Sequence, residues 1–263
     1  MLSKGTTALI TGGGGGIGGG MAEAFVEHGM NVVLADIDLG YAQEQASKLG
    51  AAATAVKLDV VSLASWADAR RAAIERFGRV DVLCNNAGIS TVPAPIDQFP
   101  PHEFERLMAI NVTGVFNGIV TFVPDMRARR SGHIVNTSSL NGLIPYATLG
   151  AYTASKFAVL GLSDALRDEL KPHGVGVSTL LPGLTRSRMS LNPQSAAHTA
   201  RESSQALEAR MMQPIWLGRA VVRAIENNQA YIMTHPGHKA ALEQRFRAFL
   251  DACGEPAQPG YGA

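Results

Sequence analysis

The chain has 263 residues, of which 46% are hydrophobic and 17% charged, so it can bury a large core and is not expected to be disordered. Its 23 Lys and Arg residues balance 22 Asp and Glu residues, and the formal charge of +1 predicts neither nucleic acid nor an anionic membrane as a partner. No apolar run approaches the roughly 18 residues that span a bilayer. Cys84 and Cys253 lie far apart, one at the end of an apolar run and the other in a polar tail, so no disulfide is predicted and a cytoplasmic location is favoured.

Short runs rich in β-branched residues and leucine recur along the chain, with longer, alanine-rich amphipathic stretches between most of them. The predicted strands are Thr7–Ile10, Asn31–Ala35, Thr54–Leu58, Val80–Cys84, His133–Thr137, Val175–Leu181 and Tyr231–Met233. The predicted helices are Ile17–His28, Leu39–Leu49, Ser62–Phe77, His102–Met126, Ala151–Lys171 and Pro214–Asn227. This alternation predicts an α/β fold with a doubly wound parallel sheet of about seven strands and helices on both faces.

One stretch, between the sixth predicted strand and the predicted helix at Pro214, has the hydrophobic pattern of neither a strand nor a helix. Residues 186–213 are rich in Ser, Ala and Met, and we interpret them as a partly helical, mobile lid over the site. A C-terminal tail is placed from about residue 235, with an amphipathic stretch up to Leu250 and a Gly- and Pro-rich end from Gly254. Residues 1–263 are therefore predicted to form one domain.

A run of glycines follows the first predicted strand and leads directly into a helix, in the order Thr11–Gly12–Gly13–Gly14–Gly15–Gly16–Ile17–Gly18. A dinucleotide pyrophosphate needs backbone N–H groups at a helix N-terminus, and glycine allows the φ values and the close approach that this requires. The strand before and the helix after distinguish this motif from a merely flexible loop. The sequence predicts a Rossmann dinucleotide site that includes Gly12, Gly15, Gly16, Ile17 and Gly18.

The second predicted strand is followed by Asp36, about twenty residues past the glycines. An acidic side chain there can accept hydrogen bonds from the adenosine ribose hydroxyls, and it repels a 2′-phosphate. No Arg or Lys occupies the glycine loop or the position after Asp36, so NAD is predicted over NADP. The alternative is that Asp36 or Asp38 merely starts the next helix, a role that suits Asp38 better.

Tyr152 and Lys156 lie four residues apart near the start of a predicted helix, which places both on one helical face. A phenol has a pKa of roughly 10, too high for efficient proton exchange at neutral pH, and a nearby cation lowers that pKa. We therefore hypothesise that Tyr152 exchanges a proton with the substrate. A Tyr-x-x-x-Lys pair occurs often by chance, so the hypothesis depends on the other motifs.

The set of motifs resembles the short-chain dehydrogenase/reductase family over nearly all of residues 5–234. Besides the glycine loop and the Tyr152–Lys156 pair, the set comprises Asp59–Val60, Asn85–Asn86–Ala87–Gly88, Asn111, Ser139 and Pro182–Gly183. The resemblance implies that Tyr152 protonates or deprotonates the substrate oxygen and that Ser139 hydrogen-bonds it. Lys156 would bind the nicotinamide ribose and lower the phenol pKa. Asn111 would hold a water that links Lys156 to solvent, unless its side chain simply bonds within its own helix.

The resemblance also implies a set of cofactor contacts beyond the glycine loop and Asp36. They are Asp59, Val60, Asn86, Ala87, Gly88, Tyr152, Lys156, Pro182, Gly183, Thr185 and Ser187. Asp59 and Val60 would flank adenine, and the backbone after Pro182–Gly183 would meet the carboxamide. Ser187 stands where many relatives have Thr. Because Ser keeps the hydroxyl and loses a methyl group, we expect the nicotinamide contact to survive with a looser lid hinge.

The residues expected around the substrate, by analogy of position, are mostly apolar. They are Ser139, Leu140, Asn141, Tyr146, Leu149, Tyr152 and Met189. No cation is firmly placed among them, because Arg186 and Arg188 are expected to face solvent. These residues favour a bulky, neutral, aromatic or alicyclic secondary alcohol or ketone. Gly118–Pro124 also looks similar to dehydrogenases of aryl secondary alcohols from lignin-type dimers, although this segment says little about a pocket.

The predicted function is NAD-dependent oxidoreduction of a secondary alcohol or ketone. The alternatives are a carbonyl reductase that works mainly toward the alcohol and a non-catalytic NAD-binding regulator. A regulator would need the dinucleotide site alone, whereas this chain also has Ser139, Tyr152, Lys156 and Asn111.

Family members commonly form tetramers through helices that correspond to residues 102–126 and 151–171, so the resemblance implies a homo-oligomer, either a tetramer or a dimer. No metal site is predicted. His235 and His238 stand beside Pro and Gly without a third ligand.

Overall fold

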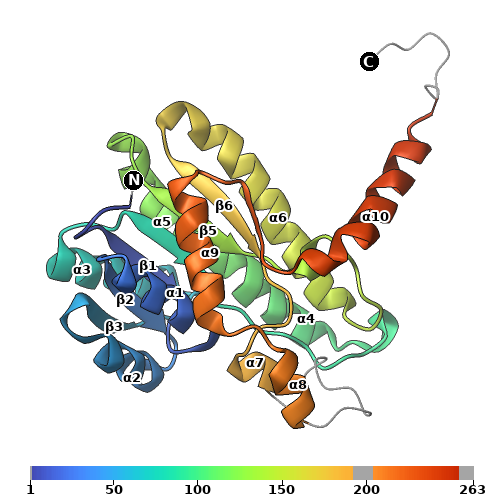
Figure 1. The fold of residues 1–263 in the computed structure, drawn as a ribbon, viewed down its shortest axis with the longest axis horizontal. Helices are drawn as coiled ribbons and strands as arrows, with labels where there is room; N and C mark the ends of the chain where they lie inside the picture. The colour runs from blue at the N-terminus through green and yellow to red at the C-terminus, as the bar shows by residue number, and fades with distance from the viewer. Residues whose placement is uncertain (1, 192–203, 255–263) are drawn as a thin grey trace.

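The computed structural model describes residues 2–191 and 204–254 (Figure 1). Its centre is a seven-stranded sheet in the order β3-β2-β1-β4-β5-β6-β7, and each neighbouring pair of strands is parallel. The strands are β1 (Thr7–Thr11), β2 (Asn31–Asp36), β3 (Ala53–Lys57), β4 (Val82–Asn85), β5 (His133–Thr137), β6 (Gly176–Leu181) and β7 (Tyr231–Met233). The predicted doubly wound parallel sheet is confirmed.

Helices cover both faces of the sheet. One layer contains α1 (Gly16–Glu27), α2 (Leu39–Leu49) and α9 (Pro214–Glu226), and the other contains α3 (Leu63–Phe77), α5 (Gly114–Ala128) and α6 (Gly150–Leu170). Along β1, Leu9 packs into the core under the second layer, while Ala8 and Ile10 pack into the core under the first. Successive side chains of a strand point to opposite faces, so a strand covered on both faces must be apolar throughout.

The helix that the sequence predicts over His102–Met126 is divided into three parts. The helix α4 (Pro101–Met108) runs into a π-helical turn, η3 (Ala109–Thr113), and this turn runs into α5. A π-helical turn inside an α-helix is less stable than regular helix and is frequent at functional sites. Here the turn contains Asn111.

The helical segment Pro101–Ala128 is long and apolar enough to cross a membrane by length and composition, with a mean hydropathy of 1.6 over its most apolar 18 residues. The expectation that no apolar run reaches such a length was therefore wrong. Half of its most apolar window is buried inside the chain, where Val115, Ile119 and Phe122 belong to the core cluster on one face of the sheet. Burial against the sheet explains this composition.

The helices α1 and α9 cross so closely that glycine is required on both. A Cβ atom on Gly218 would collide with the carbonyl oxygen of Gly20, and a Cβ atom on Gly20 would collide with the backbone of Pro214. Because α1 begins at the glycine loop, this crossing fixes the loop relative to the sheet.

The predicted lid is closed at its base by backbone contacts. The N–H of Arg186 donates to the carbonyl oxygen of Met212 at 3.0 Å, and the N–H of Met212 donates to that of Leu184 at 3.1 Å. Two short helices belong to the lid, α7 (Arg188–Leu191) and α8 (Ser204–Arg210). Residues 192–203 of the predicted lid lie outside the described residues.

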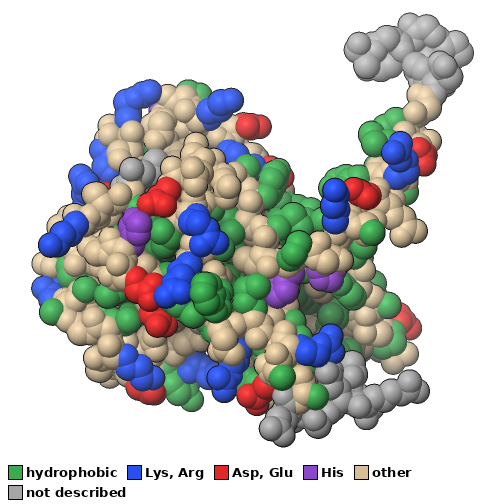
Figure 2. Space-filling model, viewed as in Figure 1, with side chains coloured by type: hydrophobic (Ala, Val, Ile, Leu, Met, Phe, Trp, Pro, Cys, Tyr) green, Lys and Arg blue, Asp and Glu red, His purple; other side chains and the backbone are tan. Residues whose placement is uncertain are grey.

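The last helix, α10 (Lys239–Ala252), extends away from the sheet (Figure 1) and carries hydrophobic side chains beside charged ones (Figure 2). None of its residues is buried, and Phe246, Phe249 and Leu250 are each more than half exposed. The guanidinium of Arg245 stacks on Phe157 of α6, 5.2 Å from the ring centroid. The remaining elements are the 3-10 turns η1 (Gly50–Ala52), η2 (Ile96–Gln98), η4 (Leu140–Gly142), η5 (Lys171–His173) and η6 (Pro236–His238).

Candidate active site

A cavity of about 440 Å³ lies at the carboxyl ends of β1 and β4. At this point the strand order reverses direction, and open α/β sheets bind ligands in the resulting crevice. The predicted residues that line the cavity are Gly12, Gly15, Gly16, Ile17, Asp36, Asp59, Val60, Asn86, Ala87, Gly88, Tyr152, Lys156, Pro182, Ser187 and Met189. Residues far apart in the sequence, from the glycine loop to the lid, therefore meet in one place.

The other predicted residues lie behind or beside the cavity. They are Gly18, Asn111, Ser139, Leu140, Asn141, Tyr146, Leu149, Gly183 and Thr185. Leu140 is only 3% exposed, and its assignment to the substrate stays a prediction. Gly18 lies directly against Gly12, because a Cβ atom there would collide with the Gly12 carbonyl.

The glycine loop is shaped for an anion. Gly12, Gly15 and Gly16 have φ angles of +64°, +151° and +54°, which side chains disfavour. A Cβ atom on Gly15 would meet nothing within 4 Å, so this side of the loop is open. The helix α1 has no acidic residue in its first turn and no side-chain cap. Its first N–H groups are thus available to an anionic group such as a pyrophosphate.

Asp36 shapes the same loop from the end of β2. Its Oδ2 atom accepts the N–H of Gly14 at 2.9 Å, and its Oδ1 atom accepts the N–H of Asp38 at 3.1 Å. A carboxylate has further lone pairs, so ribose hydroxyls can also bind it. Asp38 instead caps α2 by accepting the N–H of Tyr41 at 3.2 Å. The two acids thus have different roles, and Asp38 is the helix start.

Thr11 is a positioning residue that the sequence interpretation missed. Its Oγ1 atom accepts the N–H groups of Asn86 at 2.8 Å and Ala87 at 2.9 Å. The side-chain amide of Asn86 donates in return to the Thr11 carbonyl at 2.9 Å. These bonds join the ends of β1 and β4 and fix the wall of the cavity. The available signal was a hydroxyl residue placed directly before the glycines.

Tyr152 and Lys156 project from the first turns of α6 into the cavity. The Lys156 Nζ atom lies 5.6 Å from the centroid of the Tyr152 ring and donates to the Thr137 carbonyl at 3.1 Å. Burial lowers the pKa of Lys156 to about 8. Burial also raises the pKa of Tyr152, although a hydrogen bond with the Ser139 side chain acts in the opposite direction. Desolvation thus sets the net direction for Tyr152, and the expectation that Lys156 lowers this pKa stays a prediction.

Asn111 connects the turn after β4 to α6. It is buried, its Nδ2 atom donates to the Ile89 carbonyl and the Ser155 hydroxyl at 3.0 Å each, and its Oδ1 atom accepts the N–H of Ile89 at 2.8 Å. The Ser155 hydroxyl donates in turn to the Tyr152 carbonyl at 2.7 Å. The alternative of a side-chain bond within its own helix is not observed. Gly88 lies beneath both Asn111 and Lys156, where a Cβ atom would approach each closely.

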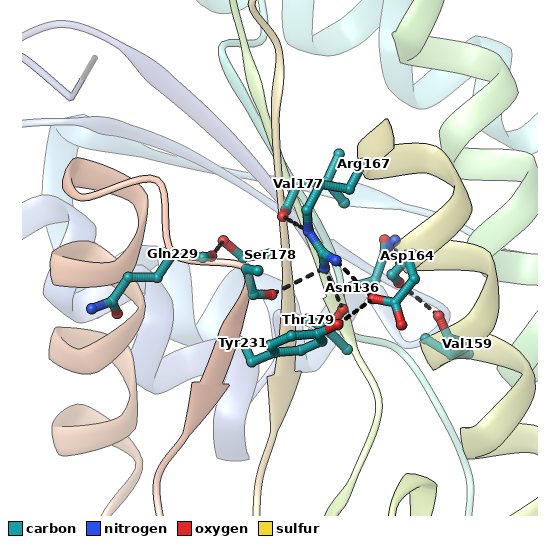
Figure 3. Close-up of polar contacts among 11 residues, drawn as sticks. Asn136, Val159, Asp164, Arg167, Val177, Ser178, Thr179, Gln229 and Tyr231 are labelled. Atoms are coloured by element: carbon teal, nitrogen blue, oxygen red, sulfur yellow. Dashed lines mark hydrogen bonds and ion pairs between the residues drawn. The ribbon is translucent and has the colours of Figure 1, made fainter. Parts of the chain in front are cut away.

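A second polar cluster fixes the far half of α6 (Figure 3). Arg167 donates to the Val177 carbonyl of β6 at 3.0 Å and to Asp164 at 2.7 Å. Its guanidinium also stacks on Tyr231 of β7, 4.8 Å from the ring centroid, and the Tyr231 hydroxyl donates to Asp164 at 3.1 Å. The helix that carries Tyr152 is thus held to the neighbouring strands β6 and β7.

The base of the lid is supported by His235. Its Nδ1 atom accepts the N–H of Gly183 at 3.0 Å, and its Nε2 atom lies 3.2 Å from the Leu184 carbonyl. Burial lowers the pKa of His235, opposed by the bond to Leu184. Within residues 2–191 and 204–254, no group of three or more His, Cys, Asp or Glu residues could hold a metal ion.

The two lid arginines are both exposed, as expected, but they have different neighbours. Arg186 is half-exposed and lies 3.5 Å from the carboxylate of Glu208. Arg188 lines the cavity, and its guanidinium carbon lies 3.7 Å from the centroid of the Tyr41 ring. The fold brings α2 beneath the lid, which the sequence order does not reveal.

Known proteins share both the sequence pattern and the fold. The profile of the short chain dehydrogenase family matches residues 6–197. The C alpha-dehydrogenase of a Sphingobium species is 32% identical over 93% of this chain and 85% of its own length. The 3-alpha-(or 20-beta)-hydroxysteroid dehydrogenase of Mycobacterium tuberculosis is 35% identical over 86% of this chain and 85% of its own length. The crystal structure of a short-chain dehydrogenase/reductase from Burkholderia phymatum in complex with NAD has a TM-score of 0.86 and 29% identity over the full length of both chains.

Proposed function

This chain belongs to the short-chain dehydrogenase family, and from that premise we propose that it transfers a hydride between NAD and a secondary alcohol or ketone, with Tyr152 exchanging the proton. The observation that carries the proposal is the meeting, in one cavity, of the glycine loop, Asp36, Tyr152 and Lys156. A non-catalytic regulator would have no use for the last two residues.

Nicotinamide, when bound, accepts a hydride from the alcohol or supplies one to the ketone. In the direction of reduction, negative charge grows on the carbonyl oxygen, and the Tyr152 hydroxyl gives its proton to that oxygen. Ser139, whose side chain acts to lower the pKa of Tyr152, donates a hydrogen bond to the same oxygen and stabilises its charge. In the direction of oxidation, Tyr152 takes the proton from the alcohol.

Lys156 supplies a cation close to the proton-exchanging group. Its pKa of about 8 leaves it mostly protonated at neutral pH, and a cation near a phenol favours the phenolate. We assign it the ribose contact as well, and we assign Asn111 to a proton path from Lys156. The bonds from Asn111 to Ile89 and Ser155 support a fixed position for such a path.

NAD is the proposed cofactor, and oxidation of the alcohol is the proposed direction. Asp36 supports NAD, because a carboxylate at the end of β2 binds ribose hydroxyls and repels a 2′-phosphate. The similar Burkholderia phymatum protein was solved with NAD. Cellular NAD is mostly oxidised, which favours the alcohol as substrate; reduction of a ketone is the alternative. The exposed free thiol of Cys253 supports a cytoplasmic, reducing location.

A bulky, neutral secondary alcohol is the proposed substrate. Ile89, Pro182 and Met189 give the cavity apolar walls, which favour a ligand without charge. The similar hydroxysteroid dehydrogenase acts, by its name, on an alicyclic alcohol. Aromatic and alicyclic secondary alcohols are therefore the first compounds to test.

The test is a screen of such alcohols with NAD and with NADP, following the absorbance of the reduced cofactor. For any accepted alcohol, Tyr152→Phe is expected to lower kcat/KM by about 100- to 10,000-fold, the usual contribution of acid–base catalysis, while the Kd for NAD stays the same. Tyr231→Phe is the matched control, because it removes a half-exposed hydroxyl outside the cavity. Undiminished turnover by Tyr152→Phe would refute the assigned chemistry.

A further inference from the structure

We propose that Arg188 binds the pyrophosphate of the dinucleotide at the glycine loop. This proposal rests on the proposed function, since it requires a dinucleotide in the cavity. It gives a specific task to a residue that the sequence places in an irregular segment with no recognisable motif.

The lid lies directly on the glycine loop at this point. A Cβ atom on Gly16 would lie 2.8 Å from the Cβ atom of Ser187, the residue before Arg188. Arg188 lines the same cavity as Gly15 and Gly16, which begin α1. The backbone just before Arg188 therefore lies against the glycine loop, where backbone N–H groups can bind an anion.

Tyr41 determines where the guanidinium lies. The Arg188 guanidinium stacks on the Tyr41 ring, with 3.7 Å between its carbon and the ring centroid. Tyr41 itself lies against the loop, because a Cβ atom on Gly14 would be 2.7 Å from the Tyr41 Cβ atom. A stacked guanidinium presents its N–H groups at its edges, where they can bind phosphate oxygens in pairs.

Arg188 differs from the other two cations that line the cavity. Lys156 is buried and donates to the Thr137 carbonyl, and Arg106 lies 3.3 Å from the carboxylate of Glu103. Arg188 has no hydrogen bond or ion pair within the part of the chain that the structure describes. The Glu44 carboxylate of α2 interacts with its charge, but no described group accepts a hydrogen bond from the Arg188 guanidinium.

The pyrophosphate fits this cation better than a 2′-phosphate does. A 2′-phosphate would stand beside the carboxylate of Asp36, which already holds the N–H groups of Gly14 and Asp38 and would repel it. The pyrophosphate would instead meet α1 and Arg188 together. The chemistry recognised is therefore the diphosphate shared by NAD, NADP and ADP.

The experiment measures binding rather than turnover, by calorimetric titration of Arg188→Gln and the unaltered protein with ADP, adenosine and 2′-AMP. We expect Arg188→Gln to weaken ADP binding about tenfold, as the loss of a charge-assisted hydrogen bond predicts, and to leave adenosine binding unchanged. Arg186→Gln is the matched control: it removes a lid guanidinium two residues away that pairs with Glu208 instead of lining the cavity. It should bind ADP as the unaltered protein does.

Three results would overturn the proposal: equal ADP affinity in Arg188→Gln and the unaltered protein, an equal loss for ADP and adenosine, or a loss confined to 2′-AMP. The first denies the contact, the second indicates an indirect effect through Tyr41, and the third assigns Arg188 to the 2′-position. If no alcohol is turned over yet ADP binding falls as expected, the proposal stands and the proposed catalysis fails. Absence of ADP binding to the unaltered protein would refute both.

Discussion

At the end of β2, the Asp36 carboxylate accepts two backbone N–H groups and also lines the cavity. One side chain therefore shapes the glycine loop and presents a negative charge to the cofactor. Its neighbour Asp38 has a comparable hydrogen bond in the cap of α2 but does not line the cavity. Substituting each aspartate in turn therefore distinguishes the effect of charge in the cavity from the effect of a lost hydrogen bond to the backbone.

Asp36→Asn is expected to reduce the preference for NAD over NADP, measured as the ratio of the two kcat/KM values, by at least about tenfold. The amide removes the charge that repels a 2′-phosphate, and its oxygen still accepts one of the two backbone N–H groups that the carboxylate accepts. Asp38→Asn should leave the ratio unchanged, since Asn is an equally good helix cap. An unaltered ratio in Asp36→Asn, or a preference of the unaltered protein for NADP, would contradict the role of Asp36.

The site residues could be predicted from the sequence where a motif fixes both residue type and spacing, as with Tyr152 and Lys156. The net direction of the Tyr152 pKa could not, because it depends on how much of the fold closes around the ring. Leu140 was assigned by its position along the chain, which does not reveal that its side chain is almost fully buried in the η4 turn. Arg188 was missed because its partner ring lies on α2, far away in sequence.

At the level of elements, the crossing of α1 and α9 determines where the glycine loop lies. Gly218→Ala is expected to destabilise the fold by about 1–3 kcal/mol, the cost of overpacking, because its Cβ atom would collide with the Gly20 backbone. The displacement of α1 should also weaken NAD binding. Urea unfolding and cofactor titration measure the two effects.

Gly161→Ala is the matched control for this prediction. Gly161 is also a helical glycine, and a Cβ atom there would meet nothing within 4 Å. Alanine should therefore be neutral or stabilise the helix by roughly 0.5–1 kcal/mol. Equal stabilities of the two variants would mean that the contact between α1 and α9 can relax.

The predicted strands and helices agree with the structure to within a few residues, because glycines and caps mark their ends. Gly50 and Gly78, for example, both have positive φ angles where α2 and α3 end. The π-helical turn at Asn111 was not predicted, since the register of backbone hydrogen bonds leaves no pattern in residue type. The lid had no periodicity to interpret, so its contacts with the glycine loop came only from the structure.

At the scale of the whole molecule, stability is expected to depend on pH through His133 of β5. This side chain is fully buried, its Nε2 atom lies 2.8 Å from the Ser178 hydroxyl, and burial lowers its pKa from 6.5 to about 4. Below pH 6.5 the unfolded chain binds a proton that the folded chain does not bind, so the free energy of unfolding falls as the pH falls toward 4.

Between pH 7 and pH 5 this linkage amounts to about 2 kcal/mol. Urea unfolding at the two pH values measures this effect. From pH 7 to pH 5, the free energy of unfolding of His133→Asn should fall by about 2 kcal/mol less than that of the unaltered protein. His102→Asn, a change at an exposed histidine with 78% side-chain exposure, should behave as the unaltered protein does. The same acid sensitivity in His133→Asn would show that other groups cause it.

Assembly of the molecule is the other property at this scale, and we propose a homo-oligomer formed through α4, α5 and α6. Phe104 and Phe116 are 41% and 49% exposed on the first two of these helices, and association would bury these aromatic side chains. Phe116→Asp should shift the sedimentation coefficient at micromolar concentration toward the monomer, whereas Leu63→Asp at the start of α3 should not. A monomeric unaltered protein would contradict this proposal.

The π-helical turn η3 also limits how the length of this chain can vary in evolution. Each residue advances an α-helix by about 100°. The additional residue in the turn therefore changes the direction in which the α5 side chains point relative to those of α4. Deleting one residue there would give a more regular helix, yet it would rotate either Asn111 away from Ile89 or Phe122 out of the core. Descendants of this chain can therefore exchange residues in the turn, but a deletion that improves the helix would dismantle the site.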